Sequence, residues 1–389
     1  MGTYIAGSAV THCIDGWRYI GKAIHAYLRG DVGATRHLAY YAELRATMAI
    51  LASEGIGAFN NQHYVIDKNR KCNLISQRHP DPAIGTHQFV WDAFSIWAKS
   101  PAAVKTLHRL VVAGDLPLQE WLRHLGGNSS ATHTAIAAKW LTQWGVDIAQ
   151  MIEDRELRNE ASYNPSAFVL PNSETSAQAI SFVNDLWELA EPRSSARFEH
   201  LDKILIRKSI ITTLVAVHGK TELGKNDLLG RTIDALLHQV TPSDSPAEEW
   251  RKFLLETTSA KKTIIDEAGC KPNPSLPSHN KQMLARAFML LRVASGSCEM
   301  LFKNLPTFES ADLRFWWEPI NRNAGISDDM DDEFQMIDLW KDVEDAISNI
   351  RANNLTQEPS SHFNSWQRDS FSLSLICTTE RIGLWGVGL

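Results

Sequence analysis

The clearest pattern along the chain is a run of apolar residues at helical spacing within its first sixty positions. After His37 these residues fall at three- and four-residue steps, at Tyr41, Leu44, Met48 and Leu51. Such spacing places them on one face of a helix, and we expect that face to be buried. Gly55 and Gly57 offer the left-handed conformations common at helix ends, so the helix is predicted to stop there. Residues 62–67 are predicted to be extended.

The same spacing, read together with prolines and polar caps, predicts a largely helical chain. Further predicted helices cover residues 86–97, 116–125, 131–152, 174–189, 198–217, 227–239, 246–259 and 284–302, and another begins at residue 101. Thr86 is in position to cap the first of these helices. Pro101 suits a first helical turn, because the N–H that proline lacks would have no helical partner there.

Two patterns near the C-terminus predict different structures. A heptad-like seam steps by four and three residues, at Met336, Trp340, Val343, Ile347 and Ile350. Because the seam lasts only about two heptads, it indicates packing within a helical bundle rather than a free coiled coil. Phe371, Leu373 and Leu375 alternate with serines, and this period of two predicts an edge strand.

The predicted fold is therefore mostly α, a helical bundle in two parts with minor extended segments. The segment 191–195, Glu-Pro-Arg-Ser-Ser, is the best linker candidate, so the two domains are predicted to cover residues 1–192 and 193–389. The 389 residues, of which 44% are hydrophobic and 22% charged, are enough for two cores. Most of the thirteen tryptophans are expected to anchor helix packing.

Charge and cysteine content narrow the class of protein. The formal net charge of −6 argues against a protein that coats nucleic acid nonspecifically, although a local basic patch stays open. The five cysteines are scattered without a Cys-x-x-Cys spacing, which indicates reduced thiols. The chain has no signal-peptide pattern and no apolar run near the ~20 residues that span a membrane. We therefore expect a cytoplasmic protein without membrane contact.

Several familiar catalytic and binding motifs are incomplete or absent in the sequence. Gly219-Lys220-Thr221 has Leu214 where a phosphate loop needs glycine. The acidic run 328–333 could gather a hard cation, but carboxylates just before a helix are favoured by its dipole, and helix capping is the preferred interpretation. The histidines lack the spacing of zinc ligands, and no nucleophile elbow occurs. We expect neither a metal nor a cofactor.

The segment 157–165, Leu-Arg-Asn-Glu-Ala-Ser-Tyr-Asn-Pro, is the one candidate chemical site. Arg158 and Asn159 fall near a predicted helix end, and Tyr163 follows five residues after the arginine. A structural interpretation competes with a chemical one: the arginine pairs with Glu153 or Asp154, and the asparagine caps the helix. Arg45, one helical turn from Tyr41, is a second arginine open to either interpretation.

This segment resembles the HEPN superfamily, helical proteins of which many are metal-independent RNases. They are marked by an arginine, often a polar neighbour, and a histidine four to six residues on. Residues 37–46 also look like the early helix of bacterial HEPN-like proteins of the YaaC type, and the resemblance covers about residues 36–170. It implies that Arg158 holds the scissile phosphate and Asn159 orients it, while Tyr163 stands where the family has histidine. An unperturbed tyrosine titrates near ~10 and is a poor base, so phosphate recognition is favoured over catalysis.

Two functions of different classes follow. The resemblance implies a component of a bacterial conflict or antiphage defence system that cleaves or binds RNA, and that works as a homo-oligomer or with protein partners. The alternative is a non-enzymatic helical adaptor in a multi-protein complex. The many tryptophans, the seam and the apolar tail Leu384-Trp385-Gly386-Val387-Gly388-Leu389 favour it, because such surfaces can face a partner.

Overall fold

The computed structural model describes a mostly helical protein. Its described residues are 1–60, 62–75, 85–125, 174–192, 197–223, 227–240, 242, 244–256, 264–270, 279–304, 310–323, 325–326, 336–356 and 361–387. The chain forms two compact units, each built from separate stretches. Unit 1 comprises Met1–Ser95, Trp144–Glu188 and Ile264–Leu389, and unit 2 comprises Ile96–Gln143 and Leu189–Thr263. The predicted mostly-α class is confirmed, and the predicted division after residue 192 stays a prediction.

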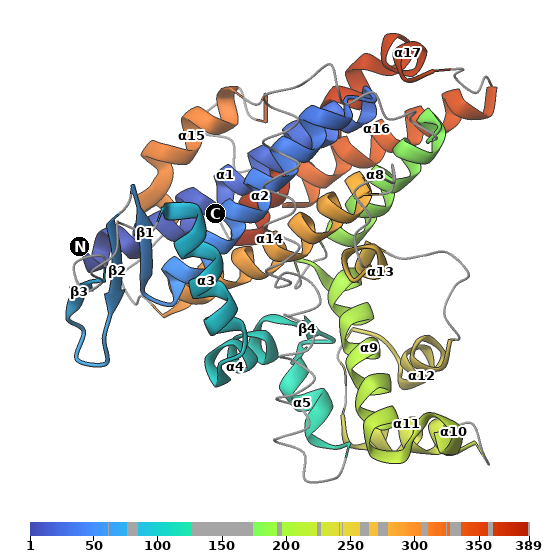
Figure 1. The fold of residues 1–389 in the computed structure, drawn as a ribbon. Coiled ribbons are helices and arrows are strands. Elements are labelled where there is room, and N and C mark those ends of the chain that lie inside the picture. Colours follow the sequence, from blue (N-terminus) through green and yellow to red (C-terminus); the bar gives the residue numbers. More distant parts are fainter. Residues whose placement is uncertain are drawn as a thin grey trace. The chain divides into compact units, whose positions relative to one another are not determined.

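Unit 1 contains the longest helices and a small sheet (Figure 1). Its elements are α1 (Gly2–Leu28), α2 (Val32–Ser53), β1 (Ile56–Phe59), β2 (Gln62–Ile66), β3 (Cys72–Leu74), the start of α3 (Thr86–Ala98), most of α8 (Ser176–Ala190), α13 (Ile264–Ala268), α14 (His279–Lys303), the 3-10 turn Ser310–Leu313, α15 (Arg314–Asn323), α16 (Met336–Thr356), α17 (His362–Leu375) and α18 (Glu380–Val387).

The helix pair α1 and α2 forms the centre of unit 1, together with α14 (Figure 1). Ile5, Cys13, Trp17 and Ile20 of α1 are fully buried, and their spacing of eight, four and three residues keeps them on one side of the helix. The chain reverses between the two helices at Gly30, whose φ of 77° lies in the left-handed region that glycine adopts readily. Asp31 then caps α2 by accepting a hydrogen bond from the Ala34 N–H.

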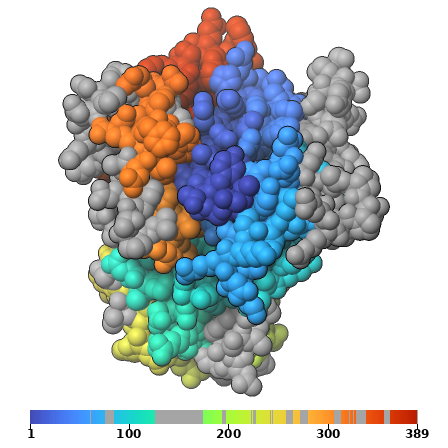
Figure 2. All heavy atoms as spheres, turned by 90° about the vertical axis from the view of Figure 1, so that its left-hand side faces the viewer, coloured from blue at the N-terminus to red at the C-terminus, as the bar shows by residue number. Residues whose placement is uncertain are grey.

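A three-stranded antiparallel sheet follows α2, in the order β1-β2-β3. Gly55, with φ of 81°, makes the turn out of α2, as its position in the sequence predicted. The β1–β2 register pairs Ile56 with Val65 and Phe59 with Gln62. The predicted helix end and the predicted extended segment are both confirmed. The N-terminal end of α1 (darkest blue) lies at the surface in Figure 2, where Tyr4 is 64% exposed.

The C-terminal residues correct two predictions. The predicted edge strand at 371–375 is wrong, because these residues belong to α17. Ser361 caps this helix, and its buried positions Ser365, Asp369, Ser372 and Leu373 follow helical spacing, so the serine alternation was incidental. The apolar tail does not face a partner over residues 384–387, because Leu384, Trp385 and Val387 are buried within the chain itself.

Unit 2 contains shorter helices and a two-stranded ladder. Its elements are α4 (Pro101–Leu110), β4 (Val112–Ala113), β5 (Leu116–Pro117), α5 (Leu118–Arg123), α9 (Glu199–His218), α10 (Lys220–Leu223), α11 (Leu228–Gln239) and α12 (Ala247–Leu255). Trp121 and Trp250 pack with ring centroids 4.6 Å apart. Lys203 lies over the Trp250 ring and forms ion pairs with Glu199 and Asp244, so the core of this unit combines aromatic and matched polar contacts.

The other predicted helices agree with the structure to within a few residues, except that α5 is shorter than predicted and the one over 131–152 lies outside the described residues. Pro101 stands in the first turn of α4 behind the Ser100 cap, as expected. The seam of α16 packs inward, with Trp340, Val343, Ile347 and Ile350 buried. Gly219-Lys220-Thr221 forms the end of α9 and the start of a single helical turn.

Candidate anion-binding site

The residues predicted to form a site, Arg158, Asn159 and Tyr163, lie outside the described residues, as does the acidic run 328–333. Arg45 is described: it lies on α2 with 30% of its side chain exposed. It contacts His12 and Asp15 of α1, which is the structural support that one of its two interpretations predicted. The RNA-cleaving role that the resemblance implies for Arg158 stays a prediction.

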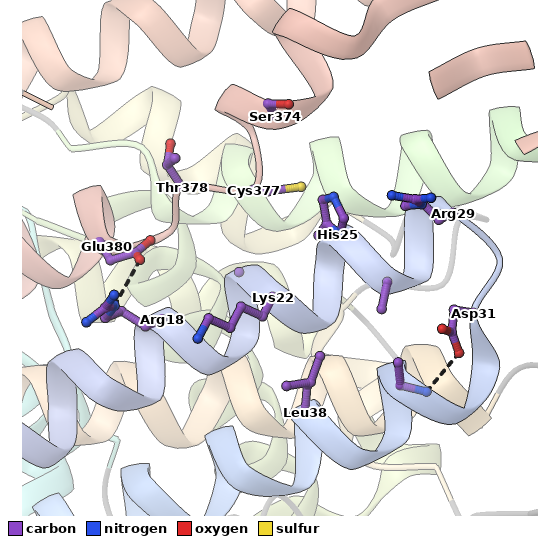
Figure 3. A pocket seen from close by; sticks show the side chains of 13 residues that line it. Arg18, Lys22, His25, Arg29, Asp31, Leu38, Ser374, Cys377, Thr378 and Glu380 are labelled. Atoms are coloured by element: carbon purple, nitrogen blue, oxygen red, sulfur yellow. Dashed lines mark hydrogen bonds and ion pairs between the residues drawn. The ribbon is translucent and has the colours of Figure 1, made fainter. Parts of the chain in front are cut away.

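A surface cleft of about 550 Å³ lies along the outer face of α1 in unit 1. One wall is the C-terminal half of α1, a second is the start of α2, and a third is the turn between α17 and α18 (Figure 3). Its lining residues are Arg18, Gly21, Lys22, His25, Ala26, Arg29, Asp31, Ala34, Leu38, Ser374, Cys377, Thr378 and Glu380. We name this cleft the α1 groove.

Basic side chains line the α1 groove along one helix. Arg18, Lys22, His25 and Arg29 succeed one another at steps of four, three and four residues. At ~1.5 Å rise per residue, this stripe extends over about 16 Å on one face of α1. Figure 3 shows all four side chains projecting from the same helix, beside the segment that holds Ser374 and Thr378. The groove is thus a local concentration of positive charge on a chain whose net charge is negative.

The two carboxylates of the α1 groove are each engaged. Glu380 forms an ion pair with Arg18, at 3.4 Å from Oε1 to Nε. Asp31 accepts the capping hydrogen bond from the Ala34 N–H at 2.9 Å. Lys22 and Arg29 are exposed, and neither forms an ion pair with any residue that the structure describes. Their charges are therefore available to a negatively charged ligand.

Burial shifts the titration of three other groups that line the groove. Burial and the neighbouring Arg29 lower the pKa of His25, so its imidazole is favoured in the neutral form. Burial raises the pKa of Glu380, while hydrogen bonding and the charge of Arg18 act in the opposite direction. Burial and then the charge of Glu380 raise the pKa of the Cys377 thiol. The thiol stays protonated at neutral pH, which makes it a poor nucleophile.

Aromatic rings accompany the cations of α1. Tyr19 stacks on Tyr41 of α2, with centroids 5.3 Å apart and planes at 23°, and the Lys22 ammonium lies 5.9 Å from the Tyr19 centroid. Trp366 of α17 contacts His25 edge-on at 4.6 Å and lies 5.8 Å from the Arg29 guanidinium carbon. Cations interleaved with half-buried rings are the combination that proteins use to bind a single-stranded nucleic acid.

Close backbone packing holds the third wall of the α1 groove in place. A Cβ on Gly21 would meet the Cys377 carbonyl oxygen at 2.3 Å, so only glycine lets α1 approach this turn. The Thr379 hydroxyl donates to the Trp17 carbonyl, and Trp187 Nε1 donates to the Ile376 carbonyl at 2.9 Å. Both contacts are buried, so the turn that lines the groove is anchored to the core.

The α1 groove was missed by sequence reasoning, which predicted no helix before His37. The signals were present: a buried apolar face, and basic residues at 18, 22, 25 and 29 with the spacing of one helix face. Glycines at positions 2, 7, 16 and 21 lower helix propensity and obscure that pattern. The described residues include no cluster of three or more potential metal ligands.

Comparison with protein-family models, with curated proteins and with solved structures found no match. The HEPN resemblance therefore rests on the residues of the chain alone. Among the described residues, no helix is both long and apolar enough to cross a membrane.

Proposed function

We propose that this chain binds the phosphate backbone of a single-stranded nucleic acid, RNA in the first instance, in the α1 groove. The observation that carries the proposal is the pair Lys22 and Arg29, two exposed cations on one face of α1 that form no ion pair with any described residue. They lie seven residues apart, a rise of about 10 Å, and each is next to an aromatic ring. This spacing suits an extended polyanion better than a single small anion.

The interior of unit 1 supports the proposal by contrast. The buried charges of Arg286 and Glu43 form an ion pair at 3.0 Å. In the α1 groove the arginine and lysine side chains outnumber the carboxylates, and two of these cations, Lys22 and Arg29, are exposed and form no ion pair within the described part of the chain. The net charge of −6 limits nonspecific attraction to nucleic acid, so binding is expected to be confined to this groove.

The defence role that the HEPN resemblance implies is compatible with RNA binding and stays part of the proposal. Cleavage would additionally require the segment around Arg158, and RNA binding at the α1 groove does not depend on it. The adaptor alternative loses one of its supports, since the tail residues Leu384 and Trp385 pack inside the protein's own core. RNA binding by the groove is therefore the better supported function.

Fluorescence anisotropy with a labelled single-stranded RNA of about twelve nucleotides, within the ~4–16 range of known site sizes, tests the proposal. In Lys22→Gln/Arg29→Gln, two charge-assisted contacts of about 1.5 kcal/mol each are lost, so affinity should fall about a hundredfold. The slope of log affinity against log salt should shrink by about 1.4, or ~0.7 for each phosphate.

The matched control is Lys105→Gln/Arg109→Gln, which removes the same charge from exposed positions of α4. This control should change the affinity for RNA less than twofold, because it alters the net charge by two but removes no contact in the α1 groove. Equal losses in the two double variants would mean that binding follows overall charge, and the α1 groove would not be the site.

A further inference from the structure

A second cluster of charged and polar residues lies on the outer face of α1, closer to its N-terminus. Arg45 of α2 donates from Nη1 to Nδ1 of His12 at 2.8 Å, and the same Nη1 is 3.7 Å from Asp15 Oδ2. Arginine can only donate, so His12 Nδ1 is an acceptor and its ring proton is on Nε2. His12 is thus a neutral residue that holds the guanidinium in a fixed orientation.

The described residues use only a small part of the hydrogen-bonding capacity of Arg45. A guanidinium has five N–H donors, and its only partners among the described residues are His12 and Asp15. With 30% of its side chain exposed, Arg45 can present its remaining donors to a ligand. Burial raises the pKa of Asp15, although Arg45 opposes the shift. At 3.7 Å from Nη1, the carboxylate of Asp15 lies beyond hydrogen-bond distance and does not occupy an N–H donor of Arg45.

The same helix face connects this cluster with the α1 groove. His12, Asp15, Tyr19, Lys22 and Arg29 follow steps of three, four, three and seven residues along α1, which keeps them on one side of the helix. The positive charges of Arg45, Arg18 and Lys22 all act on Asp15, so the two ends share one electrostatic surface. Tyr19 stands between Asp15 and Lys22 along α1, and it stacks on Tyr41, which precedes Arg45 by four residues on α2.

We propose that Arg45, oriented by His12, is a second phosphate-binding residue, and that the ligand is one extended strand reaching from Arg29 to Arg45 across the Tyr19–Tyr41 pair. The face from residue 12 to residue 29 of α1 extends about 25 Å. At ~3.4 Å per stacked nucleotide, this length accommodates about seven nucleotides. The tyrosine pair serves as a platform for a base between two phosphate contacts. This inference rests on the proposed function of the α1 groove.

The experiment measures affinity against RNA length, with oligonucleotides of about four to twelve nucleotides that bracket the predicted site. Wild-type affinity should rise steeply up to about seven nucleotides and then level off. Arg45→Gln should bind the longest RNA about tenfold more weakly and the shortest less than twofold more weakly, since only a long strand reaches both ends. Lys22→Gln/Arg29→Gln should lose affinity for every length.

Arg123→Gln, at a 70% exposed side chain of α5, is the matched control. It should leave the affinities for the longest and the shortest RNA unchanged. If Arg45→Gln lowers the unfolding midpoint, Arg45→Lys carries the test: it keeps the charge and loses the planar fork, and should again weaken only long RNA.

The outcomes separate the two proposals. If Arg45→Gln binds long RNA as tightly as the wild type does, while Lys22→Gln/Arg29→Gln loses affinity, Arg45 is not a second contact and the α1 groove remains the binding site. Loss in neither variant would overturn both. A duplex bound as tightly as a single strand of equal length would overturn the base-stacking part, because paired bases are not free to stack on tyrosine.

Discussion

The α1 groove and the polar contacts between α2 and α14 belong to the same unit, but they differ in whether their charged side chains are buried and partnered. Between α2 and α14, Arg286 Nε donates to Glu43 Oε1 at 3.0 Å, with 6% and 1% of these side chains exposed. Arg36, fully buried, donates from Nε to Asn280 at 3.0 Å. In the groove, Lys22 and Arg29 are exposed, and neither forms an ion pair with another described residue. A buried ion without a partner costs several kcal/mol, whereas an exposed one is hydrated at little cost. Matched charges therefore stabilise the fold, and unmatched surface cations are left for a ligand.

The largest expected effect comes from breaking the buried pair. Glu43→Gln leaves the Arg286 charge buried without its counter-ion, so the free energy of unfolding should fall by about 3 to 5 kcal/mol. Urea denaturation followed by circular dichroism measures it. Glu344→Gln, at a 53% exposed side chain paired with Lys341, should cost at most about 0.5 kcal/mol. A loss below about 1 kcal/mol for Glu43→Gln would contradict the structural role of the pair.

Low pH should destabilise the protein through His12. Burial and Arg45 lower the pKa of His12 from 6.5 to about 4. Between these values the unfolded chain binds the proton and the folded one does not, so stability falls as pH drops from about 6.5 to about 4. The loss amounts to about 3 kcal/mol at ~1.4 kcal/mol per pKa unit.

His12→Gln should remove that part of the pH dependence of stability. Asp15, whose pKa is raised by burial, contributes in the opposite direction in both proteins. Its contribution therefore cancels when the unfolding free energy of the variant is subtracted from that of the wild type. Chemical denaturation at a series of pH values gives both curves. His124→Gln, at an exposed position in unit 2, should follow the wild-type curve. Parallel curves for wild type and His12→Gln would refute the assignment.

Packing beneath the α1 groove should show a smaller effect. The methyl group of Gly21→Ala would stand 2.3 Å from the Cys377 carbonyl oxygen, which forces a backbone shift at a cost of about 2 kcal/mol. Gly7→Ala on the same helix meets nothing within 4 Å, so it should be neutral or stabilise by about 0.5 to 1 kcal/mol. Thermal unfolding of the two variants compares them directly. Equal behaviour would show that α1 and the turn do not approach this closely.

The smallest effect on stability is expected for Lys22→Gln/Arg29→Gln. Neither cation forms an ion pair within the described protein, so the free energy of unfolding should change by less than about 0.5 kcal/mol. The same protein should lose RNA affinity, and this separation of stability from binding is what distinguishes the α1 groove from the buried pair. A clear destabilisation measured in urea would place these residues with the structural charges instead.

Much of the fold could be predicted from the sequence, because capping and apolar spacing are local. Thr86 and Pro101 begin their helices where expected, and α2 ends where Gly55 allows it. The prediction for α2 was nevertheless incomplete. One buried face was expected, but Arg36 and Glu43 on another side are also buried, because α14 covers it. The serine alternation in α17 misled for a related reason, since a period of two over five residues does not distinguish a strand from part of a helix face.

The candidate site could be predicted only in part. The basic residues of α1 have helical spacing in the sequence, and Arg45 was recognised as either buried or functional. Its partners His12 and Asp15, however, lie 33 and 30 positions away along the chain. No local pattern connects such residues. The third wall of the α1 groove comes from the turn at Cys377 and Thr378, which only the folded chain brings to Gly21.

The sequence by itself determined the helical class, most helix boundaries and the limits that net charge places on nucleic-acid binding. The tertiary structure decided which charged side chains are buried against a polar partner and which are exposed. Arg36 and Lys22 both lie on long helices, yet one is buried against Asn280 and the other faces solvent. The physical reason is that helix formation depends on neighbours three or four residues apart, whereas burial depends on which helices meet. The assignment of the α1 groove as a site therefore follows from packing, and not from a motif.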